Sequence, residues 1–210
     1  MSDATPALCL HGLGVSPRHL RPLVRVLARE RHVEAPTLPL GVGVGELAAL
    51  ADELLGAQAV VFANSMGCQV AVELALRARE RVAALVLVGP TPDPAAPTLR
   101  RQFARLALDS TREPAALNWV VASDYLRRGP RNTLRSAREM LQHRIGERAP
   151  LVDVAALVVR GERDPIVSQP WANELARRLH GEIAVIPGAA HAAHFTHPED
   201  VVAAAARFLR

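Results

Sequence analysis

The fold of this chain is decided by residues 59–76, which read AVVFANSMGCQVAVELAL. The apolar run before Ser65 predicts a buried strand, and the apolar residues after it recur with helical spacing. A serine at such a sharp strand-to-helix turn is held in a strained conformation, so the residues two before and two after it must be small. Ala63 and Gly67 meet this demand. Ser65 is therefore a candidate nucleophile, although a helix N-cap at Ser65 would explain the same residues.

Two later apolar runs end in side chains that could activate a nucleophile. Residues 155–167, AALVVRGERDPIV, carry Asp164 in the turn after a strand, and residues 182–191, EIAVIPGAAH, end at His191. The carboxyl ends of parallel strands share one crevice, so Ser65, Asp164 and His191 can meet although they lie far apart in the sequence. Their order along the chain is nucleophile, acid and base.

A fourth segment, ALCLHGLG at residues 7–14, predicts a strand that ends in a glycine-rich loop. Such a loop can direct a backbone N–H into a cavity. An oxyanion hole needs two donors placed where negative charge develops, and the amides of Leu13 and Met66 are the natural candidates.

Together the motifs HGLG, ANSMG, GERDP and GAAH resemble the oxyanion loop, nucleophile elbow, acid turn and histidine loop of the α/β-hydrolase fold superfamily. The resemblance covers almost the whole chain and departs from the family at Ala63, where glycine is usual. It implies that Ser65 attacks a carbonyl carbon, that His191 takes and returns the proton, and that Asp164 orients the imidazole. It implies no cofactor.

The remaining apolar periodicity agrees with an α/β fold. Strands are expected near 6–10, 33–37, 58–64, 82–89, 155–160 and 182–187, and helices near 17–30, 45–55, 66–79, 169–180 and 198–209. This alternation predicts a parallel sheet flanked by helices. Members of the family usually carry two further strands first, so the resemblance implies a trimmed sheet of about six. Pro36 and Pro39 suit an edge position for the second strand.

Residues 91–150 interrupt the alternation after the fourth expected strand, where the family usually inserts a helical cap. We therefore expect an α/β-hydrolase core of residues 1–90 and 151–210 and a helical cap of residues 91–150. Two or three apolar cap residues should face the substrate, from a set comprising Phe103, Leu106, Leu108, Trp119, Leu134, Met140, Leu141 and Ile145. The pocket is expected to include His11, Gly12, Trp119 and His194.

The positive charge of the chain is concentrated in the expected cap. Residues 91–150 hold 11 arginines and 6 acidic residues, a net charge of +5, whereas the rest of the chain has a net charge of −1. A basic cap could attract an anionic substrate, such as a carboxylate, a coenzyme A thioester or an acidic acyl carrier protein. A solvated helical face explains the charge equally well. Nucleic-acid binding is disfavoured because no aromatic stacking platform accompanies the arginines.

A histidine cluster and two cysteines require separate interpretation. His191, His194 and His197 could be read as metal ligands, but spacing of three aligns ligands on a helix, and this segment leaves a strand through a loop. We therefore expect no metal site. Cys9 and Cys68 are expected to be small buried packing residues rather than a disulfide or a catalytic thiol.

The composition is that of a single globular domain: 210 residues, 50% hydrophobic, with no apolar stretch long enough to span a membrane. The first residues, MSDATP, lack the features of a signal peptide, which predicts a cytoplasmic protein. All 25 basic residues are arginine, so Schiff-base chemistry on lysine and a Walker phosphate loop are excluded. Abundant arginine and alanine favour a GC-rich bacterial source.

These observations predict a small, cofactor-independent serine hydrolase, carboxylesterase-like, that cleaves an ester or similar acyl bond of a small apolar molecule through an acyl-enzyme. The elbow NSMG also resembles hydrolases that cleave carbon–carbon bonds in carboxylated diketo substrates, and a thioesterase is a further alternative. A protein of a different class, which keeps the fold and only binds a small ligand, also stays open. The four motifs argue against this alternative, because a protein that only binds a ligand has no physical reason to keep all of them.

Overall fold

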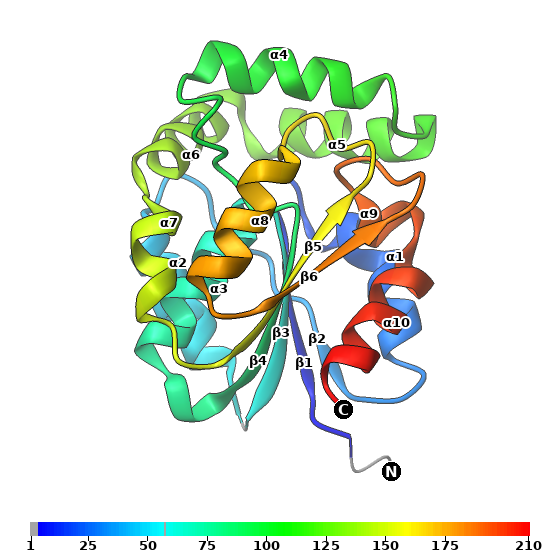
Figure 1. Ribbon diagram of the computed structural model, residues 1–210. Helices are drawn as coiled ribbons and strands as arrows, with labels where there is room; N and C mark the ends of the chain where they lie inside the picture. Colours follow the sequence, from blue (N-terminus) through cyan, green and yellow to red (C-terminus); the bar gives the residue numbers. More distant parts are fainter. Residues whose placement is uncertain (1–3, 57) are drawn as a thin grey trace.

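The computed structural model describes residues 4–56 and 58–210. Six strands form one sheet in the order β2-β1-β3-β4-β5-β6, and every neighbouring pair is parallel (Figure 1). The strands are β1 (Ala7–Leu10), β2 (Val33–Glu34), β3 (Ala59–Asn64), β4 (Val82–Val88), β5 (Ala155–Gly161) and β6 (Glu182–Ile186). The predicted parallel sheet of six strands is confirmed.

Helices cover both faces of the sheet (Figure 1). One face packs against α2 (Val44–Leu54), α3 (Met66–Arg77) and α8 (Gln169–Arg178). The other face packs against α1 (Arg21–Leu27) and α10 (Pro198–Phe208), with the short helices η1 (Pro17–Leu20) and α9 (Ala193–Thr196) nearby. Two more short helices, η2 (Arg79–Arg81) and η3 (Ala149–Leu151), precede β4 and β5. No helix in the described ranges is both long enough and apolar enough to cross a membrane.

The central strands are mostly apolar because both of their faces are covered. In β3, Val61 lies in the core cluster beside α3, whereas the adjacent Phe62 lies in the cluster beside α1. Leu85 and Val86 of β4 divide in the same way. This alternation is the period of two expected of a strand, and it is hidden in the sequence because neither face is polar.

The edge strand β2 is shorter than expected. It contains only Val33 and Glu34, whereas the sequence suggested a strand over 33–37. Pro36 lacks an N–H and cannot extend the ladder. The predicted edge position is confirmed, because β2 pairs only with β1.

The helical insertion expected after the fourth strand is present. Residues 91–150, here called the insertion, contain α4 (Leu99–Ser110), α5 (Ala115–Arg128), α6 (Pro130–Gln142) and α7 (Ile145–Arg148), and α4 and α5 lie beyond the carboxyl ends of the strands (Figure 1).

Hydrogen bonds of charged side chains hold the insertion to the sheet domain. Within the insertion Asp93 pairs with Arg105 at 2.9 Å, and Arg105 also donates to the carbonyl of Ile166. Asp124 accepts hydrogen bonds from both the amide and the hydroxyl of Ser16. These contacts come from separate points of the insertion, so they fix it over the sheet rather than hinge it at one end.

Candidate active site

Ser65 occupies the strained turn that the sequence predicts. It separates β3 from α3 with φ 55° and ψ −120°, a left-handed region that residues other than glycine rarely adopt. The close approach explains the small neighbours. A Cβ on Gly67 would lie 2.6 Å from the carbonyl oxygen of Leu10, and a Cβ on Gly12 would lie 3.2 Å from Cβ of Ser65.

Asp164 and His191 form a buried hydrogen-bonded pair. Nδ1 of His191 donates to Oδ2 of Asp164 at 2.9 Å. The other carboxylate oxygen, Oδ1, accepts the amides of Ile166 and Val167 at 2.7 and 3.0 Å. Because both oxygens are occupied, the carboxylate is fixed in position and the imidazole keeps its proton on Nδ1.

A buried arginine, which the sequence analysis did not single out, organises the turn that carries Asp164. Nε of Arg160 donates to the carbonyl of Val167 at 2.7 Å, and its NH2 nitrogen donates to the carbonyl of Asp164 at 2.9 Å. Its NH1 nitrogen donates to the carbonyl of Glu162 at 3.0 Å. The guanidinium therefore closes the loop onto itself and fixes the backbone that carries Asp164.

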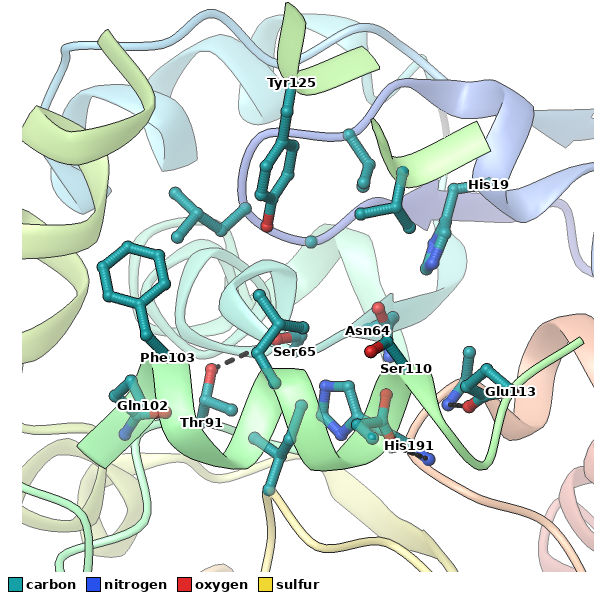
Figure 2. Close-up of a pocket in the computed structure, with 18 of the residues that line it drawn as sticks. His19, Asn64, Ser65, Thr91, Gln102, Phe103, Ser110, Glu113, Tyr125 and His191 are labelled. Atoms are coloured by element: carbon teal, nitrogen blue, oxygen red, sulfur yellow. Dashed lines mark hydrogen bonds between the residues drawn. The ribbon is translucent and has the colours of Figure 1, made fainter. Parts of the chain in front are cut away.

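The second nitrogen of His191, Nε2, is buried and has no hydrogen-bond partner in residues 4–56 and 58–210. Ser65 instead approaches Thr91, with 3.4 Å between the two hydroxyl oxygens (Figure 2). Both Ser65 and His191 line the same cavity. The His191 ring lies close to the backbone of Gly89, where a Cβ would lie 2.8 Å from Cε1 and Nδ1 of the ring.

Two further carboxylates, missed by the sequence analysis, hold the histidine loop from the insertion. Asp109 of α4 accepts the amide of His191 at 3.1 Å, and Glu113 accepts the amide of Ala192 at 2.8 Å. Burial raises the pKa of both carboxyl groups. Burial disfavours the His191 imidazolium, but the charge and hydrogen bond of Asp164, then the charges of Asp109 and Glu113, outweigh it and raise the pKa of His191 to about 9.

The two expected oxyanion donors flank Ser65. Met66 begins α3, where the first N–H groups have no partner within the helix, and Leu13 lines the cavity from the loop after β1. Neither amide has a hydrogen-bond acceptor in the described part of the chain. Both are therefore available to an incoming oxygen.

His11 braces this loop and does not line the pocket, contrary to expectation. Its Nε2 accepts the amide of Leu38 at 2.9 Å, and its Nδ1 donates to the carbonyl of Gly12 at 2.9 Å. The ring is completely buried, which lowers the pKa of His11 to about 4 and keeps it neutral. Gly12 itself does line the cavity, as expected.

The cavity above Ser65 has a volume of about 640 Å³ and is mostly apolar. Its apolar walls include Leu106, Leu117, Val121, Met140 and Ile166. Of the described residues that line the cavity, Asp109 and Glu113 carry carboxyl groups and none is an arginine. The 11 arginines of the insertion thus lie outside the lining, and the expected attraction of an anionic substrate has no arginine in the cavity to act through.

The cavity opens between α4 and α5. Phe103 and Ser110 on α4, and Ala122 on α5, both line the cavity and are exposed to solvent. Most of the rim side chains are short, so the gap between the two helices stays open. Figure 2 shows Phe103 on one side of Ser65 and Glu113 and His19 on the other.

Two expected pocket residues lie elsewhere. Trp119 does not line the cavity and is 71% exposed, because the docking of α5, and not the polarity of a single residue, decides which of its faces is covered. His194 is completely buried behind His19, which lines the cavity in its place. Three of the apolar cap residues do line it, namely Phe103, Leu106 and Met140, which agrees with the expected two or three.

The three histidines of the cluster have different partners. His191 bonds Asp164, His194 bonds His19, and His197 bonds the hydroxyl of Thr196. In the described ranges no three side chains of the kinds that bind metals come together.

The cysteines Cys9 and Cys68 are free and buried. Burial raises the pKa of the Cys68 thiol well above its usual range, and its sulfur donates a hydrogen bond to the carbonyl of Ala63 at 3.4 Å. Although it lies one turn from Ser65, Cys68 stays protonated and is a poor nucleophile.

Comparison with known proteins agrees with this geometry. A family model described as the alpha/beta hydrolase family matches residues 7–205. Similar solved structures include a hydrolase from Oleispira antarctica, with a TM-score of 0.86 and 12% identity over 99% of this chain and 92% of that chain. A thermophilic esterase from Thermogutta terrifontis has a TM-score of 0.80 and 22% identity over 100% of this chain and 91% of that chain.

The enol-lactonase from Burkholderia xenovorans LB400 has a TM-score of 0.78 and 19% identity over 99% of this chain and 92% of that chain. No curated protein matches in sequence. At these identities the structural similarity establishes the fold alone. The family model, however, spans nearly the whole chain, and this protein therefore belongs to the alpha/beta hydrolase family.

Proposed function

We propose that this protein is a serine hydrolase that cleaves an ester or similar acyl bond of a small, uncharged and largely apolar molecule. The observation that carries the proposal is the buried pair of His191 and Asp164. Nε2 of His191 has no partner in the described residues, and His191 and Ser65 line the same cavity. In this proposal the insertion serves as the cap that closes the cavity and selects the substrate.

The chemistry follows from the contacts. The Ser65 hydroxyl turns from Thr91 toward His191, gives its proton to Nε2, and forms a bond with the carbonyl carbon. The charge that develops on the carbonyl oxygen is accepted by the amides of Leu13 and Met66. The C–O bond then breaks, and His191 returns the proton to the leaving alcohol. Water then gives a proton to His191 and attacks the acyl carbon. The bond from that carbon to the Ser65 oxygen breaks, His191 returns the proton to Ser65, and a carboxylic acid is released.

The cavity favours an uncharged substrate. A carboxylated diketo acid or a coenzyme A thioester would need a cationic partner besides His191, which is engaged with Asp164. The other charged groups of the described lining are the carboxyl groups of Asp109 and Glu113. Two structural neighbours, an esterase and an enol-lactonase, are named for the cleavage of acyl C–O bonds, which is the reaction proposed here.

The proposal is tested with a fluorophosphonate probe, whose adduct on an activated serine is read by intact mass. We expect one adduct on the wild type and on Ser110→Ala, and none on Ser65→Ala. Ser110→Ala is a matched control because it removes the hydroxyl of another serine that lines the same cavity. Absence of an adduct on folded wild-type protein would contradict the proposal and favour a ligand-binding member of the family.

Substrate charge is tested with two p-nitrophenyl esters of similar length, the butyrate and the hemisuccinate. We expect kcat/KM for the neutral butyrate to exceed that for the anionic hemisuccinate by about tenfold or more, because burial of an unpaired carboxylate costs more than 1.4 kcal/mol. A faster reaction with the hemisuccinate would restore the anionic-substrate hypothesis.

A further inference from the structure

His19 and His194 form a buried pair at one side of the cavity. Nε2 of His194 and Nδ1 of His19 are 3.0 Å apart, and the ring centroids are 4.6 Å apart. His19 lies in η1, directly after the loop that carries Leu13, and His194 lies in α9, directly after His191. The pair thus joins the two loops that flank Ser65.

Both rings are neutral. Burial, followed by the neighbouring His11 and His191, lowers the pKa of His19 to about 3, and burial also lowers the pKa of His194 well below its usual range. A single proton therefore lies between the two facing nitrogens. Nε2 of His19, on the other side of the ring, then carries either an N–H or a lone pair, and in both cases it is an uncharged hydrogen-bonding group.

This Nε2 atom faces the cavity. His19 lines the cavity, and its Nδ1 is already engaged by His194. Nε2 has no hydrogen-bond partner in the described residues, and it is not sealed from solvent. Figure 2 shows the ring pointing into the cavity on the side of Asn64, away from Phe103.

We propose that His19, held in place by His194, is a substrate-recognition residue that binds a second, uncharged oxygen of the substrate, a hydroxyl above all. The proposal rests on the proposed hydrolase function and narrows it. The apolar part of the substrate would lie toward Phe103, and the hydroxyl would lie toward His19. A polar group left unpaired in an apolar cavity disfavours purely hydrocarbon ligands, so His19 would select against them.

The test uses two isosteric pairs of esters. Ethyl 3-hydroxybutyrate and ethyl 3-methylbutyrate differ in a hydroxyl on the acyl side, and 3-hydroxypropyl acetate and butyl acetate differ in one on the alcohol side. We expect the wild type to favour the hydroxylated member of one pair. In His19→Phe the ratio of the two kcat/KM values in that pair should fall about tenfold, the effect of one buried hydrogen bond. Comparing ratios removes the intrinsic reactivity of each ester.

Matched variants separate recognition from folding. His19→Asn keeps a polar atom near the position of Nδ1 for His194 but removes Nε2, so it should lose the preference even if His19→Phe does not fold. His194→Phe removes the positioning partner and should reduce the preference for the hydroxylated ester, mainly through KM. His32→Phe, at an exposed histidine, should leave all ratios unchanged.

Binding to Ser65→Ala protein, measured by calorimetry with the same ester pairs, gives a readout that needs no turnover. The proposal is supported if the hydroxylated member binds more tightly and if this preference is lost when His19→Asn is added. This result would stand even if no ester were cleaved, and only the proposed hydrolase function would then fail. Equal binding of both members in both pairs, or a preference that survives His19→Asn, would overturn the proposal for His19.

Discussion

Deprotonation of His191 between pH 6 and pH 10 should weaken the folded state by about 3 kcal/mol. The folded pKa of about 9 exceeds the ordinary value of 6.5 by 2.5, which at about 1.36 kcal/mol for each pH unit corresponds to about 3.4 kcal/mol. Because the folded pKa is the higher one, this contribution is complete below pH 6.5 and is lost as the pH rises through 9. Its source is the placement of the imidazolium among the carboxylates of Asp164, Asp109 and Glu113.

The assay is urea unfolding of the wild type and His191→Gln, followed by circular dichroism at intervals from pH 6 to pH 10. Subtracting the two free energies of unfolding cancels the titration of all other groups. The difference should shrink by about 3 kcal/mol over this range. A difference that stays constant would show that the pKa of His191 is the same in the folded and unfolded states, and would refute the counter-charge argument.

The same titration should govern catalysis. A general base must be unprotonated, so kcat/KM of the wild type should rise about tenfold for each pH unit toward a plateau above pH 9. An enzyme whose kcat/KM is already flat at pH 7 would contradict this expectation.

Four further variants test other parts of the structure. Glu113→Gln removes one carboxylate near His191, so the midpoint of the kcat/KM profile should move to lower pH, and an unchanged midpoint would exclude a contribution from Glu113. Gly67→Ala places a Cβ 2.6 Å from a backbone oxygen and should cost about 2–3 kcal/mol in urea unfolding, whereas a loss below about 0.5 kcal/mol would show that the turn can relax. Phe103→Ala should raise KM several-fold for a long acyl ester. Trp119→Ala, at a 71% exposed site, should leave kcat/KM within about twofold of the wild-type value. A large effect of Trp119→Ala and none of Phe103→Ala would place the binding surface outside the cavity.

The sequence predicts the strand-turn-helix segment around Ser65 because its constraints are local. The turn needs small residues at fixed offsets, and the apolar runs on both sides have clear lengths. Asp164 and His191 were recoverable for a similar reason, since each follows an apolar run and parallel strands bring their ends together. Their hydrogen bond could be anticipated from topology without knowing any loop conformation.

Residues of the insertion could not be assigned in this way. Trp119 and Phe103 are equally apolar in sequence, and only the docking of α4 and α5 decides that one faces solvent and the other the cavity. Asp109 and Glu113 look like ordinary polar residues of a helix end, because the amides that they accept lie about eighty positions away. The net charge of the insertion gave the wrong picture of the cavity for the same reason, since a charge count does not say which way the arginines point.

The two acceptors that hold the histidine loop limit how freely this insertion can be exchanged. Asp109 lies in α4 and Glu113 in the turn between α4 and α5, yet they support the backbone of His191 and Ala192. A chimera whose residues 91–150 came from another protein of the family would leave the amides of His191 and Ala192 without acceptors. It would also change the pKa of His191, even if the new pocket had the desired shape. Substrate range and acid–base behaviour are thus inherited together, and engineering one of them requires these two carboxylates to be retained.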